Sequence, residues 1–163
     1  QGTHNYTATQ IARYTGTLAN RGTSYQLSLV SHVTDWEGNM IERKEPEVES
    51  RMDLPEMVWD NIEEGMGELA ATNQTLKTLK ISVAGKTGTA EESKTHPNHG
   101  WFIGFAPREN PQIALTVRIA NGYSSGNVVG VGRDIFNYYF GLEPKESILT
   151  GQASQVSNNV RTD

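Results

Sequence analysis

The stretch ISVAGKTGTAEE, Ile81 to Glu92, places a Gly-Lys-Thr triplet beside a second glycine. This arrangement has two chemical uses: a loop that cradles a nucleotide phosphate, or a strand that grips a substrate carboxylate beside a nucleophile supplied elsewhere. A phosphate-binding loop needs a glycine five residues before the glycine of its Gly-Lys-Thr, and it opens a helix. Lys80 occupies that earlier position, and the residues after Thr89 do not read as a long helix. The sequence therefore favours the strand.

In a strand, successive side chains point to opposite faces, so Thr87 and Thr89 share one face with no side chain at Gly88 between them. Their two hydroxyls can then face a ligand, and the glycine allows a close backbone approach. Lys86 adds the positive charge that a carboxylate attracts. Alternation points Lys86 to the other face, so only its length and the strand twist could bring its ammonium to the same site. Taken alone, the segment is better explained as an ordinary surface strand, since threonine favours strands.

The chain around this strand carries alternating helical and strand-like patterns. Residues 7–20 have helical spacing, with Thr7 as a candidate N-cap and Gly22 near the expected end. Residues 24–43 predict a hairpin around a turn at 35–39. The remaining predictions are a helix at 54–70 whose start is capped near Asp53 and Pro55, strands at 81–90, 101–106 and 113–120, and a last helix at 126–142 with Val128, Val131, Ile135 and Tyr139 on one face.

Two further motifs, one typical of a serine nucleophile and one of a metal site, are each incomplete. Gly122 to Gly126 spells a glycine-x-serine-x-glycine elbow around Ser124, but such an elbow needs its histidine later in the chain, and all four histidines come earlier. A glycine- and serine-rich turn explains the stretch better. His96 and His99 have a spacing that could bind a metal, yet the chain has no cysteine and no further run of carboxylates nearby beyond the two glutamates of the quoted stretch. The sequence therefore predicts no metal site.

The bulk composition limits the function further. The chain has 163 residues, which is enough for one domain or part of one. Its net charge is −5 and it has no basic block, so nucleic acid is not expected as a partner. No apolar run reaches the length of a membrane span, and the start has no signal-peptide pattern. Because the chain opens on Gln1 rather than methionine, we expect a processed or excised piece.

Three segments together resemble the transpeptidase domain of class B penicillin-binding proteins. They are TATQIARYTGTLANRGTSYQLSLV, GKTGTAEE and HGWFIGFAPRENPQIALTVRIAN, and the resemblance covers residues 1–142 in order. It implies the C-terminal part of an α+β fold in which helices pack on both faces of a central antiparallel sheet, as in serine β-lactamases. Residues 143–163 are polar and lack aromatic side chains, so we expect a disordered tail.

The resemblance also assigns residues to roles. The family's Lys-Thr-Gly motif corresponds to Lys86, Thr87 and Gly88, with Thr89 following. It implies that Thr87, Gly88 and Thr89 bind the carboxylate of a D-Ala-D-Ala stem peptide or of a β-lactam. Lys86 and the backbone N–H of Thr89 are implied as catalytic groups, the latter as one of the two oxyanion-hole donors that acyl transfer needs. No cofactor or metal is implied.

The family's other two motifs are missing from their expected places. Ser-x-x-Lys, which holds the nucleophile, does not occur, and Ser125-Gly-Asn127 matches Ser-x-Asn only in spelling because it follows Lys-Thr-Gly. We therefore expect an upstream part of the same domain to carry both motifs, and the isolated chain to be inactive. The family further implies an extracytoplasmic location and an N-terminal membrane anchor outside this chain. A β-lactam sensor or a catalytically inactive homologue would carry the same strand, so both alternatives remain.

Overall fold

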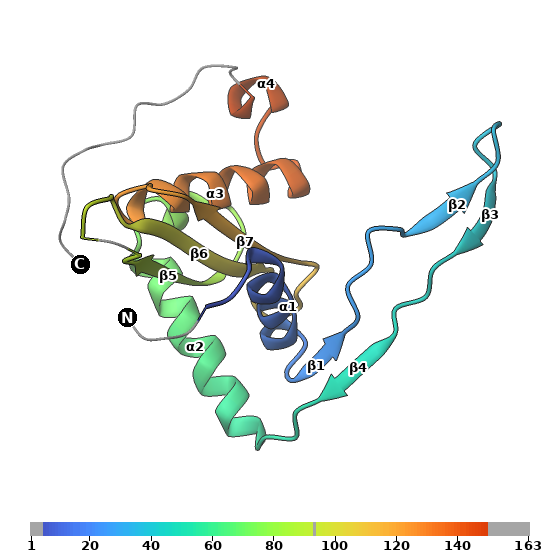
Figure 1. Cartoon of the computed structure of the whole chain (residues 1–163), viewed down its shortest axis with the longest axis horizontal. Coiled ribbons are helices and arrows are strands. Elements are labelled where there is room, and N and C mark those ends of the chain that lie inside the picture. Colours follow the sequence, from blue (N-terminus) through green and yellow to red (C-terminus); the bar gives the residue numbers. More distant parts are fainter. Residues whose placement is uncertain (1–4, 93, 150–163) are drawn as a thin grey trace.

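The computed structural model describes residues 5–92 and 94–149, and Figure 1 shows the whole chain. The elements in chain order are α1 (Ala8–Ala19), β1 (Thr23–Tyr25), β2 (His32–Thr34), β3 (Met40–Arg43), β4 (Val48–Arg51), α2 (Glu56–Thr72), the 3-10 helix η1 (Leu76–Thr78), β5 (Ala84–Ala90), β6 (His99–Ala106), β7 (Ile113–Ile119), α3 (Gly126–Phe140) and α4 (Lys145–Ile148). Helices and antiparallel strands are mixed along the chain, so the predicted α+β class is confirmed.

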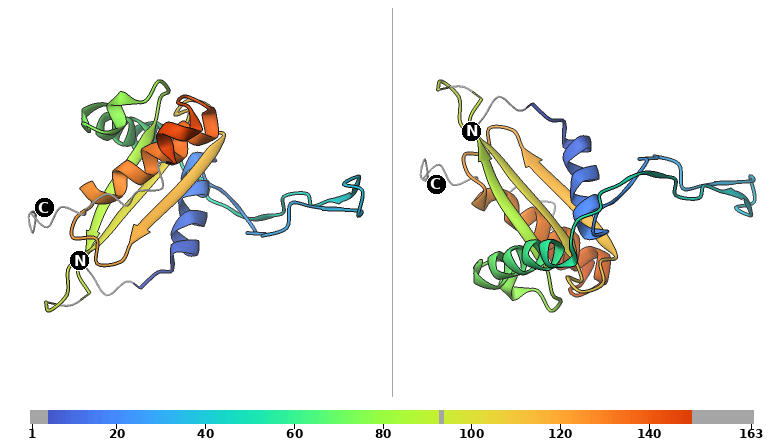
Figure 2. Two further views of the ribbon diagram at one scale, coloured as in Figure 1. Left: turned by 90° about the horizontal axis from the view of Figure 1, so that it is seen from above. Right: turned by 90° about the horizontal axis from the view of Figure 1, so that it is seen from below.

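The central sheet has the strand order β5-β6-β7, and both pairs are antiparallel. Successive side chains of a strand point to opposite faces, so Thr116 lies on one face of β7 and Val117 on the other. The hydroxyl of Thr15 on α1 lies 3.0 Å from that of Thr116, whereas Val117 packs into the core with Phe136 of α3. Helices α1 and α3 therefore cover opposite faces, as Figure 2 shows from above and below. The helix α2 packs along β5.

The core on the α3 face centres on Phe102, whose side chain has no exposed surface. Three glycines surround its ring: a Cβ built on Gly85, Gly104 or Gly132 would lie 2.8, 2.9 or 2.5 Å from a ring atom. Such distances are well inside van der Waals contact, so none of the three positions accepts a side chain without movement. Burying a phenylalanine contributes about 1.5–3 kcal/mol. The ring thus fixes how closely β5, β6 and α3 approach one another.

The three glycines around the Phe102 ring, Gly85, Gly104 and Gly132, form a glycine cage that explains why the predicted face of the last helix was wrong. Of the four residues predicted on one face, Val128 is buried, but Val131, Ile135 and Tyr139 are exposed. The buried residues of α3 are instead Val128, Val129, Gly132, Phe136 and Asn137. The prediction was wrong because a search for apolar side chains ignores a glycine, whereas Gly132 lies at the centre of the contact with the sheet.

The two earlier helices differ in how well their starts were predicted. Thr7 caps α1 as expected, because its hydroxyl accepts from the Gln10 N–H and the Gln10 side chain accepts from the Thr7 N–H. The start of α2 near Asp53 was wrong, since the N-cap residue is Pro55, with ψ at 140° and no side-chain cap. The proline is itself the reason, because it disfavours helical backbone at the residue before it.

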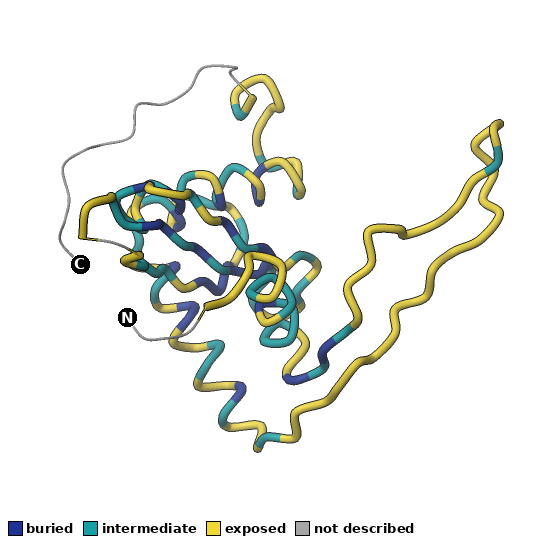
Figure 3. Tube along the Cα trace, in the orientation of Figure 1, coloured by how far each residue is buried: buried dark blue, intermediate teal, exposed yellow. Residues whose placement is uncertain are grey.

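Strands β1 to β4 form a long antiparallel arm that leaves the sheet (Figure 1) and is exposed along most of its length (Figure 3). The predicted turn at 35–39 is confirmed, with a φ of 88° at Gly38. The Asp35 carboxylate accepts hydrogen bonds from the backbone N–H groups of Glu37 and Asn39 and from the Asn39 amide. These bonds, the Asn39 side chain foremost, lower the pKa of Asp35 below its ordinary value. Its charged form therefore holds the tip of the arm.

The predicted tail lies mostly outside the described residues. Its beginning differs from the prediction, because Lys145–Ile148 form the short helix α4 and the Lys145 ammonium lies 5.0 Å from the centre of the Tyr138 ring. No residue of α4 is buried. Among residues 5–92 and 94–149, no helix is both long and apolar enough to cross a bilayer.

The glycine cage yields a paired test. We expect Gly132→Ala to lower the free energy of unfolding by about 1–3 kcal/mol, because the added methyl overlaps the Phe102 ring. Gly130→Ala in the same helix is the control: nothing lies within 4 Å of its added Cβ, so we expect a gain of up to about 1 kcal/mol from helix propensity. Urea denaturation of both variants measures the difference. Equal effects of the two substitutions would contradict the cage.

Candidate functional site

The four predicted site residues lie together on β5, an edge strand of the central sheet. Lys86 and Gly88 pair with Ile103 and Trp101, which face α1. Thr87 and Thr89 pair with Phe102 and Gly100, so both lie toward the α3 face. The alternation predicted from the sequence is therefore present, with the two threonines on one face and the lysine on the other.

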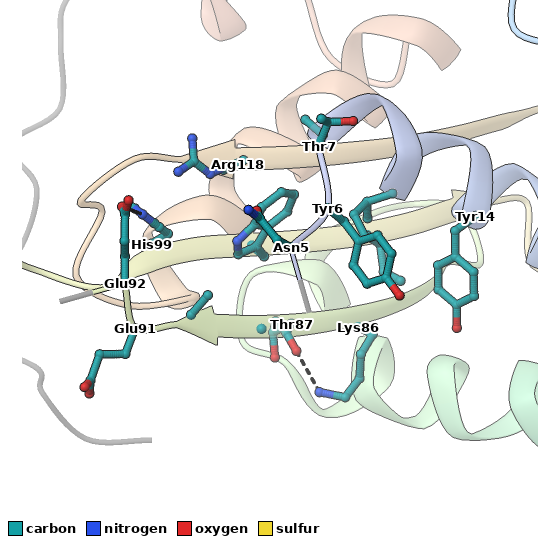
Figure 4. Close-up of a pocket in the computed structure, with 16 residues that line it drawn as sticks. Asn5, Tyr6, Thr7, Tyr14, Lys86, Thr87, Glu91, Glu92, His99 and Arg118 are labelled. Carbon is teal, nitrogen blue, oxygen red and sulfur yellow. Dashed lines mark hydrogen bonds and ion pairs between the residues drawn. The ribbon is translucent and has the colours of Figure 1, made fainter. Parts of the chain in front are cut away.

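The Lys86 side chain turns toward the edge of the sheet. Its Nζ donates a hydrogen bond of 2.7 Å to the backbone carbonyl of Thr87. In Figure 4 this contact lies on the side of β5 away from β6. The side chain is thus long enough to bring the ammonium from the α1 face to the strand edge. Alternation alone did not predict this position.

Thr89 has a contact that the sequence did not predict. Its hydroxyl accepts a hydrogen bond of 3.3 Å from the backbone N–H of Ser125, in the loop before α3. Thr89 therefore joins the site strand to the loop between β7 and α3.

The residues of the two serine motifs in that loop form hydrogen bonds with backbone groups of the loop itself. The Asn127 amide donates to the Gly122 carbonyl at 2.7 Å, and the Ser124 carbonyl accepts from the Asn127 N–H. Both ring nitrogens of His99 contact other residues, Glu92 and Asn121. The first contacts give this loop a structural role, and the last two leave neither ring nitrogen of His99 available to Ser124.

His99, which the sequence offered as a candidate metal ligand, has a different environment in the structure. It is the first residue of β6 and is 8% exposed. Within residues 5–92 and 94–149, no three His, Cys, Asp or Glu side chains converge as a metal site would need. The sequence offered one signal for the burial of His99, because the run HGWFIGFA is apolar or glycine after the histidine and so reads as a buried strand.

A cavity of about 670 Å³ opens between the start of α1 and the α1 face of the sheet. Its wall includes the site strand, and in Figure 4 Tyr6 and Tyr14 extend toward that strand from the chain above it. The Arg118 guanidinium lies 5.6 Å from the Trp101 ring, which gives the wall a second cationic group. Sequence reasoning named none of these four side chains, because they approach β5 from three other parts of the chain.

A sequence model of the penicillin binding protein transpeptidase domain matches residues 1–137. The chain is 27% identical to the peptidoglycan D,D-transpeptidase MrdA of Acinetobacter baumannii, over 99% of this chain and 26% of that protein. It is 28% identical to penicillin-binding protein 2B of Streptococcus pneumoniae, over 86% and 23%. The chain thus spans about a quarter of the length of these relatives.

A solved structure is similar as well. The imipenem acyl-enzyme complex of penicillin-binding protein A from M. tuberculosis superposes with a TM-score of 0.75 at 26% identity. The match covers 86% of this chain and 32% of that one. The similarity in sequence and the similarity in three dimensions are therefore both to penicillin-binding proteins.

Proposed function

The chain belongs to the penicillin-binding protein transpeptidase domain family, and from this membership we propose that it supplies the substrate-gripping strand of a peptidoglycan D,D-transpeptidase. The reaction would cross-link stem peptides through a serine acyl-enzyme, which a β-lactam also forms. Relatives named as D,D-transpeptidases and a relative solved as an imipenem acyl-enzyme support this reaction class.

The observation that carries the proposal is the Lys86 contact at the edge of β5. The ammonium reaches the Thr87 carbonyl from the side away from β6. Backbone groups two residues apart in a strand point the same way, so the N–H of Thr89 is directed to that edge as well. A substrate lying along the edge would meet a cation, hydroxyl donors and a backbone N–H within the run from Lys86 to Thr89.

These groups suit the two charges of acyl transfer. Lys86 and the hydroxyls of Thr87 and Thr89 bind the terminal carboxylate of a D-Ala-D-Ala stem peptide or of a β-lactam, and Gly88 permits close approach. The N–H of Thr89 donates to the oxygen that becomes negative in the tetrahedral intermediate. Because backbone donors need no reorganisation during the reaction, their position decides how much they stabilise.

The nucleophile is proposed to come from an upstream part of the same domain that carries Ser-x-x-Lys and Ser-x-Asn. Its lysine takes the proton as the serine Oγ bonds to the carbonyl carbon of the penultimate D-alanine. Collapse of the intermediate breaks the peptide bond and releases the terminal D-alanine, which takes the proton. The amine of a second stem peptide then attacks the ester and frees the serine. The cavity beside β5 is the proposed contact area for that upstream part.

The substrate class fixes the proposed location. Peptidoglycan stem peptides lie outside the cytoplasmic membrane, so the chain would work on that side, held by an N-terminal anchor elsewhere in the protein. A β-lactam sensor would use the same strand but hydrolyse its ester slowly and transfer no peptide. Turnover of a stem peptide therefore distinguishes the transpeptidase from the sensor.

Substitutions in the site strand test the carboxylate grip in a protein that contains this chain and the upstream part. We expect Lys86→Ala and Thr89→Val each to slow β-lactam acylation roughly ten- to hundredfold, since one lost charge-assisted hydrogen bond is worth about 1.5–3 kcal/mol. Stopped-flow kinetics with a fluorescent penicillin measures the rate. Lys77→Ala, which removes an exposed charge from η1, and Thr89→Ser, which keeps the hydroxyl, are the controls. Unchanged rates in both site variants would remove the proposed grip.

A second test asks where the nucleophile lies. We expect no covalent penicillin adduct on the 163-residue chain alone, because it contains no Ser-x-x-Lys pair. Adding the upstream part, in the same chain or as a bound fragment, should restore one adduct per protein. Intact-mass spectrometry reads the outcome directly. A stoichiometric adduct on a serine of residues 1–163 would refute the proposed division of the site.

A further inference from the structure

A second network of hydrogen bonds lies just beyond the C-terminal end of β5. The His99 ring is buried there, and its Nε2 lies 2.6 Å from a carboxylate oxygen of Glu92. Its Nδ1 accepts a hydrogen bond of 3.0 Å from the backbone N–H of Asn121. Figure 4 shows Glu92 and His99 meeting past the arrowhead of β5. One side chain thus joins the loop after the site strand to the loop after β7.

The bond to Asn121 determines which tautomer the ring adopts. Since a backbone N–H donates to Nδ1, that nitrogen carries no proton in the neutral ring, and the proton sits on Nε2 and points at Glu92. Acceptor and donor therefore face different partners at fixed positions. A ring held from both ends in this way is a rigid link between the two loops.

The loop after β7 needs such a link because its backbone is strained. Asn121 and Tyr123 have φ values of 52° and 67°; asparagine tolerates this left-handed region, but a tyrosine rarely adopts it. The Tyr123 N–H donates to the Asn98 carbonyl at 3.0 Å, one residue before the histidine. From the α3 face the loop presses so close to β6 that a Cβ on Gly100 would lie 2.7 Å from the Ser124 carbonyl oxygen. Strained residues of this kind persist only where surrounding contacts hold them.

Both ends of the link lead to Thr89. On one side, the loop held by His99 at Asn121 continues to Ser125, whose N–H donates to the Thr89 hydroxyl. On the other side, Glu92 follows Thr89 by three residues in the chain. We infer that His99 is a positioning residue: it fixes the loop before α3 and, through that loop, the place of Thr89 at the end of the site strand.

The inference deepens the proposed function and rests on it for its kinetic consequence. A donor that stabilises an oxyanion must keep its place within about half an ångström. The last residues of an edge strand are paired on one side only, so they open locally more easily than the strand centre. His99 removes that freedom without touching the substrate. Its loss should therefore affect the acylation step more than the initial binding of the β-lactam.

Two variants separate the two hydrogen bonds of the ring. His99→Asn keeps an acceptor near the place of Nδ1 and so preserves the bond from Asn121, whereas His99→Gln keeps a donor near Nε2 and preserves only the bond to Glu92. We expect His99→Gln to lower the acylation rate constant about tenfold, with the β-lactam dissociation constant little changed. His99→Asn should recover most of the wild-type rate. His96→Asn, at an exposed histidine three residues earlier, is the control.

Hydrogen exchange supplies a second measurement on the same proteins. The backbone amides of Asn121 and Ser125 should exchange at least tenfold faster in His99→Gln than in His99→Asn or wild type. Wild-type acylation and wild-type amide protection in His99→Gln would overturn the inference, as would equal losses in the two His99 variants. If the unsubstituted protein is not acylated at all, the proposed function fails, and the exchange rates still decide whether His99 holds the loop.

Discussion

The Phe102 ring and the three glycines around it are the constraint on which the site depends. Gly85 belongs to β5, Gly104 to β6 and Gly132 to α3, and each has its backbone against the ring where any other residue would place a methyl. The distance between the site strand and its neighbours is thus set by the absence of side chains. Because Gly85 directly precedes Lys86, a shift of the strand at the cage would displace the whole Lys-Thr-Gly-Thr run.

The glycine cage and the His99 link act at opposite ends of the same strand. The cage fixes β5 at Gly85 by packing, which is short-ranged and unforgiving of volume, and His99 fixes the far end by directional hydrogen bonds. Between them the strand edge remains accessible to a ligand, which an element buried on both sides could not offer. This division explains how the four site residues, whose side chains are small or flexible, can hold a defined geometry beside a cavity.

Local signals predicted the parts of the structure that depend on neighbours in the sequence. Thr7 and Gln10 mark the start of α1, and the motif Lys86 to Thr89 identified the site strand together with its family. The wrong face predicted for α3 has a tertiary cause, because the buried face depends on a glycine that meets Phe102, a residue 30 positions earlier. The Trp101–Arg118 pair and the link from His99 to Asn121 were missed for the same reason, since periodicity carries no information on which loops meet.

The exposed arm gives the molecule a distinctive optical property. Its turn carries Trp36, whose side chain is 92% exposed, whereas Trp59 is 5% exposed and Trp101 lies half-buried under a guanidinium. These are the chain's three tryptophans. An indole in water emits at longer wavelength than one in an apolar interior and is open to collisional quenchers. The arm, the helical layer and the wall of the cavity therefore each contribute a separate component to the intrinsic fluorescence, and the three regions can be followed without attaching a dye.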